Sequence, residues 1–91
     1  MITGSQCRAA RALTDLSRER LAISADVGVE TILRFERKLD KPNDDEVFAL
    51  QSALERGGAV FIPDNGGGIG VRLKFSKSEA NVSTYLRMKA V

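Results

Sequence analysis

Residues 17–38 read SRERLAISADVGVETILRFERK, and this stretch decides the fold. Ser17 is a good N-cap for a short helix over about 18–25, and Gly28 can cap a second helix over about 29–38. Only the three residues Asp-Val-Gly separate the two predicted helices. Two short helices joined by so tight a turn form a helix-turn-helix unit.

The apolar residues of this stretch have the spacing that such a unit needs. Ala22 is small at the point where the two helices cross, and Val27 supplies an apolar side chain in the turn. The second helix has an apolar stripe at positions i, i+3 and i+7. The side chains that we expect inside are Leu21, Ala22, Val27, Ile32, Phe35 and Leu39.

Two further helices flank the unit. A first helix is predicted over 5–13, where Cys7, Ala10 and Leu13 recur every third residue. Asn43 or Asp44 can cap a fourth helix over 45–56, with Phe48 beside its inner face. Gly57-Gly58 ends this helix, with Gly57 in the C′ position that favours a left-handed glycine.

The pattern then changes to that of strands. Residues 59–62 are a short apolar run before a proline, and residues 71–75 alternate apolar and polar side chains around a glycine-rich loop at 64–70. These two runs predict a β-hairpin. For residues 76–91, a packed helix and a frayed tail are equally compatible with the sequence.

The composition is that of one small globular domain. With 91 residues, 43% hydrophobic and 29% charged, the chain fits a single core. Fourteen basic and 12 acidic residues give a net charge of +2. Residues 1–42 contain eight of the basic and six of the acidic residues, so the whole excess lies in the first half.

The sequence argues against catalysis and against a metal or cofactor. It has no histidine, and its one cysteine, Cys7, can make neither an internal disulfide nor a zinc site of the Cys/His kind. Cys7 is best explained as a small buried residue. The acidic run at 44–46 is explained by the first turn of a helix, and the glycines at 66–70 lack the following helix of a phosphate-binding loop.

Residues Leu13 to Pro42 resemble the Cro/cI-like (XRE-type) helix-turn-helix family. The most specific features are the Leu-Ala pair, the valine in the turn and the run Glu-Thr-Ile-x-x-Phe-Glu. The resemblance implies a mainly α fold of four to five helices, followed here by a hairpin at about 59–75 and a short tail. It implies a helix-turn-helix DNA-binding domain at 1–58 and a dimerisation extension at 59–91.

The family implies a transcriptional regulator, a repressor or autoregulator that binds a double-stranded DNA operator as a dimer. The helix at 29–38 would then enter the major groove. Its candidate base contacts are Val29, Glu30, Thr31 and Arg34. The candidate phosphate contacts are Arg11, Ser17, Arg18, Gly28, Arg37, Lys38 and Lys41.

One of these contacts has an alternative partner, and two other positions depart from the family. Arg34 can read guanine, but it can also pair with Glu30 one turn earlier, which would occupy both side chains. Asp26 stands where the family often has glycine, at a position that needs a left-handed backbone. Leu33 stands where the family usually has a polar residue, so it is expected to be exposed or to contact DNA or a partner.

The hairpin is the candidate dimer interface, because its apolar side chains exceed what four short helices need. The residues proposed for this contact are Val60, Ile62, Val71, Leu73 and Phe75. Packing of the hairpin on its own helices is the alternative.

A second function class, an antitoxin or antiactivator that binds a protein, also fits the sequence. We expect a cytoplasmic, nucleoid-associated protein, since no targeting signal or apolar run of membrane length is visible.

Overall fold

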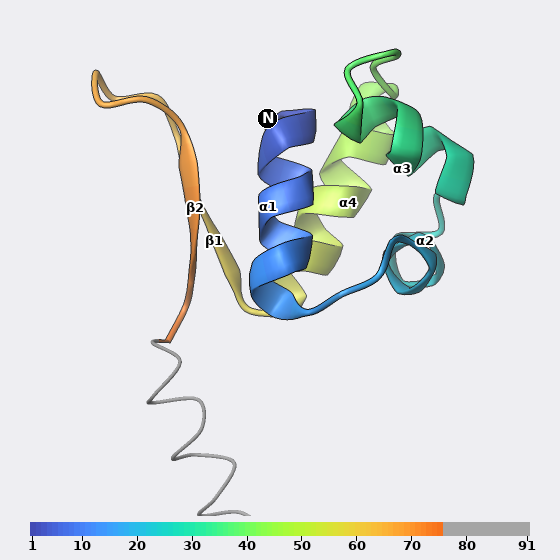
Figure 1. Cartoon of the computed structure of the whole chain (residues 1–91), viewed down its shortest axis with the longest axis horizontal. Coiled ribbons are helices and arrows are strands. Elements are labelled where there is room, and N and C mark those ends of the chain that lie inside the picture. Colours follow the sequence, from blue (N-terminus) through green and yellow to red (C-terminus); the bar gives the residue numbers. More distant parts are fainter. Residues whose placement is uncertain (76–91) are drawn as a thin grey trace, which may run out of the picture.

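The computed structural model of the chain describes residues 1–75. Four helices are followed by a two-stranded antiparallel hairpin (Figure 1), as the sequence predicts. The elements are α1 (Gly4–Thr14), α2 (Arg18–Ala25), α3 (Val29–Glu36), α4 (Asp44–Arg56), β1 (Ala59–Ile62) and β2 (Gly70–Leu73). The sequence-based alternatives for the tail at 76–91 lie outside the described residues.

The helix starts follow the predicted caps. The Ser17 side chain accepts from the backbone N–H of Arg20, and Gly28 begins α3 without a side-chain bond. Asn43, not Asp44, caps α4, in a capping box where its side chain and that of Glu46 accept from each other's backbone N–H. The side chains of Ser17 and Asn43 thus satisfy backbone donors that a helix start leaves without partners.

Three helices end on a left-handed residue that is not glycine. Asp15, Asp26 and Lys38 have φ near +55 to +61°, and after each one the next N–H donates to the carbonyl five residues earlier. This is the bonding of the Schellman motif. Aspartate tolerates this backbone better than most residues, whereas lysine does not.

The end of α3 is the main correction to the predicted boundaries. The sequence pattern extends this helix to residue 38 and places Leu39 on its apolar stripe, but α3 ends at Glu36. Lys38 turns the chain at φ 61°, and Leu39 is then 59% exposed. The i+7 spacing is therefore coincidental, because the helix has stopped before it reaches that residue.

Two smaller predictions at α4 are also wrong. Phe48 does not lie beside the inner face but is 65% exposed. It directly follows the fully buried Val47, and here the helix rotation of about 100° per residue carries the Phe48 side chain past the core to the solvent side. The left-handed residue after α4 is Gly58 (φ 107°), while Gly57 keeps a right-handed backbone.

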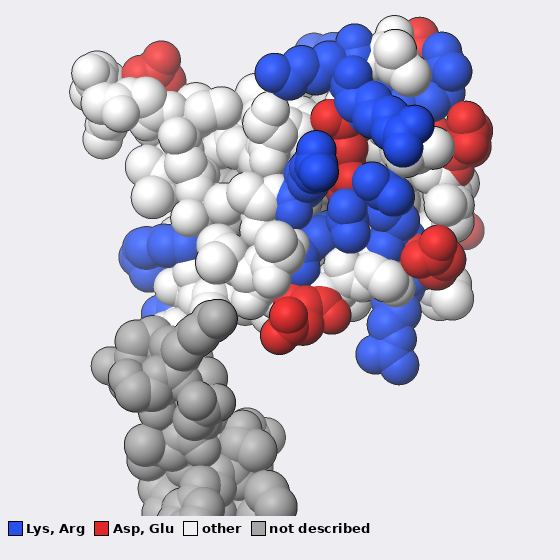
Figure 2. Space-filling model, viewed as in Figure 1, with Lys and Arg blue, Asp and Glu red and all other residues white. Residues whose placement is uncertain are grey.

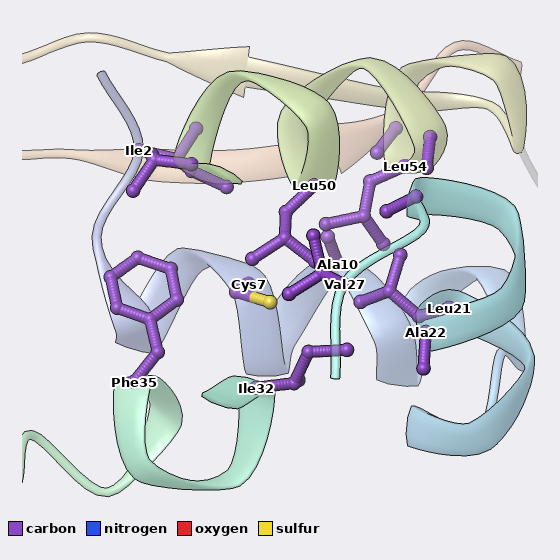
Figure 3. Packing of buried hydrophobic residues seen from close by; sticks show 14 residues of the cluster. Ile2, Cys7, Ala10, Leu21, Ala22, Val27, Ile32, Phe35, Leu50 and Leu54 are labelled. Atoms are coloured by element: carbon purple, nitrogen blue, oxygen red, sulfur yellow. The ribbon is translucent and has the colours of Figure 1, made fainter. Parts of the chain in front are cut away.

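The core lies among the four helices, with Cys7, Ile32 and Leu50 near its centre (Figure 3). Its fully buried large side chains come from every helix: Cys7, Leu21, Ile32, Val47, Leu50 and Leu54. Leu39 aside, the interior that we expected for the helix-turn-helix unit is confirmed, because all its other members are buried. A cluster of buried apolar side chains drives the packing of helices this short.

The hairpin packs on α1, on the side away from α2 and α3 (Figure 1). Its register pairs Phe61 with Val71, and both side chains pack against the core. The amide of Gln6 on α1 donates to the carbonyl oxygens of Gly70 (2.9 Å) and Ile62 (3.4 Å). The hairpin therefore packs on the helices of its own chain.

Gly4 allows the first turn of α1 to approach the end of α3. A Cβ atom at this position would lie 2.1 Å from the carbonyl oxygen of Phe35, a distance that no side chain could occupy. The backbone of α3 is thus held directly against α1. The sequence did not predict this contact, because a glycine near the start of a helix is as typical of a turn as of a close contact between helices.

Candidate nucleic-acid interface

The turn between α2 and α3 fixes how these helices sit. The N–H of Val27 donates to the carbonyl of Ala22 (3.1 Å) across the left-handed Asp26, which ends α2 after eight residues. The Val27 side chain is buried, and Gly28 then begins α3 at once. The α2–α3 turn is therefore pinned by both backbone hydrogen bonds and core packing.

The two sides of α3 differ sharply in character. Ile32, Phe35 and Glu36 point inward and are buried. Glu30 and Arg34, at positions i and i+4, lie on the opposite side and are exposed. α3 lies at an outer edge of the helical bundle (Figure 1).

The predicted base contacts lie on this outward side or at its margins. Val29 and Glu30 are exposed at the start of α3, Thr31 is half-buried, and Arg34 is exposed. The side chain of Arg34 does not pair with Glu30, so that alternative is wrong. Its Nε donates instead to Oδ2 of Asp40, in the segment after α3. Glu30 is left without this partner.

Most of the predicted phosphate contacts are exposed around the same helices. Ser17 and Gly28 are exposed at the starts of α2 and α3. Arg37, Lys38 and Lys41 are exposed at and beyond the end of α3. Figure 2 shows that the Lys and Arg side chains on this face gather over the helices rather than the hairpin.

Arg11 and Arg18 are placed differently from the other predicted phosphate contacts. The side chain of Arg11 is only 15% exposed, and Arg18 is 31% exposed. Both pair with the same carboxylate, that of Glu36. Arg11 donates from all three of its nitrogens to Glu36 and the Leu16 carbonyl, so we leave it out of the candidate interface, whereas Arg18 bonds Glu36 through Nε alone and is more exposed.

Glu36 joins three helices from inside the protein. Its Oε2 accepts from Arg11 Nε (2.7 Å) and its Oε1 from Arg11 Nη2 (2.7 Å), which makes a two-pronged contact. Oε1 also accepts from Arg18 Nε (3.0 Å), and Oε2 accepts from the Cys7 thiol (3.3 Å). One carboxylate on α3 thus accepts three hydrogen bonds from α1 and one from α2.

The ionisation of this cluster follows from its contacts. Burial raises the pKa of Glu36, but hydrogen bonds from Arg11, Arg18 and Cys7 outweigh it and hold the pKa below its usual value. Burial, and then the negative charge of Glu36, raise the pKa of Cys7 far above its usual value. The carboxylate is therefore charged at neutral pH, and the thiol is protonated and unreactive.

The sequence contains a signal by which Glu36 could have been identified as a buried carboxylate. Glu36 is next to Phe35 and four residues after Ile32, so it falls on the inward side of the predicted helix. A carboxylate in such a position needs a buried cationic partner. The partner itself, Arg11, lies 25 residues away and is not identifiable from local spacing.

The five residues predicted for the dimer contact do not share one surface. Leu73 pairs with Ala59 and Val71 with Phe61, so Val71 and Leu73 belong to the sheet face that lies toward α1. Val60 and Ile62 alternate with those residues and are half-buried on the other face. Phe75 follows β2 rather than belonging to it and is 58% exposed. Val71 is thus occupied within its own chain.

Residues 1–75 offer little for other chemistry. They contain no cluster of three or more cysteine, aspartate or glutamate side chains that could hold a metal ion. None of the helices in this part of the chain is long and apolar enough to cross a membrane. The candidate site is the α2–α3 surface, where exposed cations surround an inwardly anchored helix.

The comparisons with known proteins add no family. No protein-family model matches the chain, and no curated protein matches it significantly.

Proposed function

We propose that this protein is a sequence-specific DNA-binding transcriptional regulator that inserts α3 into the major groove. One observation carries the proposal: α2 and α3 are joined by a rigid three-residue turn, with α3 anchored inward and polar outward. The major groove of B-DNA, about 12 Å wide, admits an α-helix in this way. We expect such a protein to work in the cytoplasm, with the DNA it regulates.

The exposed side chains of α3 suit the edges of bases. Arg34 can donate two hydrogen bonds to guanine, and Glu30 can accept one from the amino group of cytosine. Val29 can contact the methyl group of thymine, and the Thr31 hydroxyl can bond a base or a phosphate. In this proposal Arg34 contributes most to base discrimination, because a two-pronged contact with guanine is worth about 1–3 kcal/mol.

The exposed cations at the end of α3 suit the phosphates on either side of the groove. Arg37, Lys38 and Lys41 would each neutralise a phosphate, and Arg18 and the N–H groups at the start of α2 would bind the backbone beside them. Neutralisation of phosphates releases counterions, so affinity should fall steeply with salt. A net charge of only +2 is sufficient, because the cations are gathered around α3.

We further propose that the protein binds as a homodimer on two half-sites about 34 Å apart. The outward hairpin face, with Val60 and Ile62, together with the exposed Phe75, is the candidate contact. Within residues 1–75, neither outer edge of the two-stranded hairpin has a sheet partner, which favours pairing with a second copy. Such a dimer on its own promoter would act as a repressor or autoregulator.

A gel shift with the DNA upstream of the protein's own gene, across a salt series, tests the DNA-binding proposal. We expect a shift at low salt whose affinity falls linearly on a log–log plot, with a slope of about −0.9 for each phosphate neutralised. Arg34→Ala should lose selectivity for that DNA over a scrambled duplex. Arg8→Ala, an exposed arginine on α1 that belongs to neither the proposed DNA contact nor the proposed dimer contact, is the matched control. No shift at low salt would refute the proposal.

A second candidate function is binding to a protein, as an antitoxin or antiactivator does. Exposed apolar side chains on α2 and α4 favour it, since Ile23 is 83% and Phe48 is 65% exposed. Leu33, the residue first assigned to such a contact, is half-buried and contributes less. Co-purification of a stable heteromer in the absence of DNA, lost on Ile23→Ser or Phe48→Ser, would favour this function.

A further inference from the structure

The segment after α3 closes back on the carbonyl end of that helix. Once Lys38 has turned the chain, the N–H of Leu39 donates to the carbonyl of Arg34 (2.8 Å). The N–H of Asp40 approaches the same carbonyl at 3.4 Å. The backbone of Asp40 is therefore fixed one helical turn beyond Arg34, which is the residue with the best chemistry for reading guanine.

The side chains of these two residues also meet. The Nε of Arg34 donates to Oδ2 of Asp40, although Arg34 is 44% and Asp40 63% exposed. Glu30, the partner expected from helix spacing, is not used. An ion pair this exposed adds little to the stability of the fold. Its main physical effect is on the direction of the guanidinium group, which is otherwise carried on a long flexible stem.

Asp40 binds only the Nε of Arg34, so this contact leaves free the edge of the guanidinium group that carries the two terminal nitrogens. A guanidinium group has five N–H donors in a flat fork, and Asp40 occupies only the one on Nε. Within residues 1–75, the terminal nitrogens Nη1 and Nη2 of Arg34 donate to no other residue. These two nitrogens form the pair that matches the O6 and N7 acceptors of guanine.

We propose that Asp40 is a specificity-determining residue that positions Arg34, presenting its terminal nitrogens to a guanine in the major groove. The inference rests on the proposed function, since it assigns a role within the same α3 surface. Asp40 touches no base itself. It limits the directions that Arg34 can take, so less side-chain entropy is lost when the guanine contact forms.

Asp40 could also compete with DNA for Arg34 instead of positioning it, and the two roles predict different base preferences when Asp40 is removed. If Asp40 merely competed with DNA for Arg34, its removal would free the arginine, raise affinity and keep or sharpen the preference for guanine. If Asp40 positions Arg34, its removal flattens the preference at a single base position. Affinity for all sequences then rises only as much as the loss of any one negative charge near DNA would raise it.

Selection from a library of randomised DNA duplexes, performed with the full chain, separates these outcomes. The parent, Asp40→Ala, Arg34→Ala and a charge-matched control, Glu55→Ala, are compared at one salt concentration. Glu55 is exposed on α4 and makes no side-chain bond within the described chain. Base preference at every position is read from the selected sequences, and thermal unfolding confirms that each variant is folded.

We expect Arg34→Ala to remove a guanine preference of about fivefold or more at one position. Asp40→Ala should weaken the preference at that same position by about two- to fivefold, the range that an exposed ion pair supports. Glu55→Ala should leave all positions unchanged. In Arg34→Ala/Asp40→Ala, the loss of Asp40 should have no further effect, because Asp40 acts through Arg34.

Each other result overturns a specific step. An unchanged or sharper guanine preference in Asp40→Ala refutes the positioning role while leaving DNA binding intact. An unchanged profile in Arg34→Ala refutes the assignment of Arg34, and with it that of Asp40. If the parent enriches no sequence and binds no duplex at low salt, the proposed function fails, and this inference fails with it.

Discussion

Replacement of Glu36 by glutamine tests the buried cluster that ties α3 to α1 and α2. Glu36 accepts three N–H bonds from arginine and one from the Cys7 thiol, and its side chain is only 1% exposed. Glutamine keeps the shape but replaces one acceptor oxygen with a donor. In the less costly orientation, the amide nitrogen takes the place of Oε2. Arg11 Nε and the thiol then lose their acceptor.

The expected cost follows from these bonds. A hydrogen bond to a charged group contributes about 1.5–3 kcal/mol, and removing one member of a buried ion pair costs about 3–5 kcal/mol. Arg11 is 15% exposed, so water relieves part of the stranded charge. We therefore expect a loss of about 2–4 kcal/mol from a total stability of about 5–14 kcal/mol for a chain of this size. The midpoint of thermal unfolding should fall by about 10–25 °C.

Urea unfolding followed by circular dichroism measures this loss, with Glu55→Gln on the surface of α4 as the matched control. The control should change stability by less than about 0.5 kcal/mol. A loss of stability in Glu36→Gln no larger than that of the control would refute the reasoning. It would mean that burial of the three charges already cancels what their bonds contribute.

The same pair of proteins gives a pH test with a definite sign. The pKa of Glu36 is lower in the folded state, so its contribution is complete above the pKa of an unfolded glutamate, about 4.3. The contribution is lost as the pH falls through the folded-state pKa. The stability difference between the parent and Glu36→Gln should therefore be constant near neutral pH and shrink in acid. A difference that grows in acid would contradict the lowered pKa.

Three further predictions use the backbone and the surface. Gly4→Ala should cost more than about 2 kcal/mol in urea unfolding, because its Cβ would collide with the Phe35 carbonyl, whereas Gly67→Ala in the open hairpin loop should be nearly neutral. Asp26→Gly should stabilise the protein by up to about 1 kcal/mol by relieving a left-handed backbone, and a clear loss would contradict that strain. Lys38→Ala should weaken DNA binding alike for all sequences and reduce the salt slope by about 1, so a change in base preference would contradict a phosphate contact.

Local signals account for the parts of the fold that the sequence predicted well. Ser17, Gly28 and Asn43 each cap a helix that the pattern placed within one residue of its true start, and the two strands form the expected hairpin. Caps and periodicity act over a few residues, so they can be identified from the chain alone. The left-handed backbone of Asp26 was expected from the resemblance, because glycine often stands at that position, and its φ of 55° confirms the expectation.

The missed features depend on contacts between distant parts of the chain. Lys38 adopts a backbone that lysine rarely uses, so nothing local predicts the end of α3 at Glu36. Alternation along the hairpin sorts its side chains into two faces but does not say which face α1 covers. The structure turns Phe61 inward, although the pattern analysis gave it no role. The partner of Arg34 was mistaken for a similar reason, since Asp40 reaches it only after that unexpected turn.

The shortness of α3 makes its anchors part of the proposed recognition. Eight residues span about 12 Å, and an isolated helix of that length is not stable in water. The direction in which Glu30 and Arg34 point is therefore set by what holds the inner side, namely Ile32, Phe35 and Glu36. Because Glu36 is bonded to both α1 and α2, the cluster that stabilises the fold also fixes the angle at which α3 would meet DNA. A variant weakened at Glu36 should accordingly lose operator affinity even at temperatures where it remains folded.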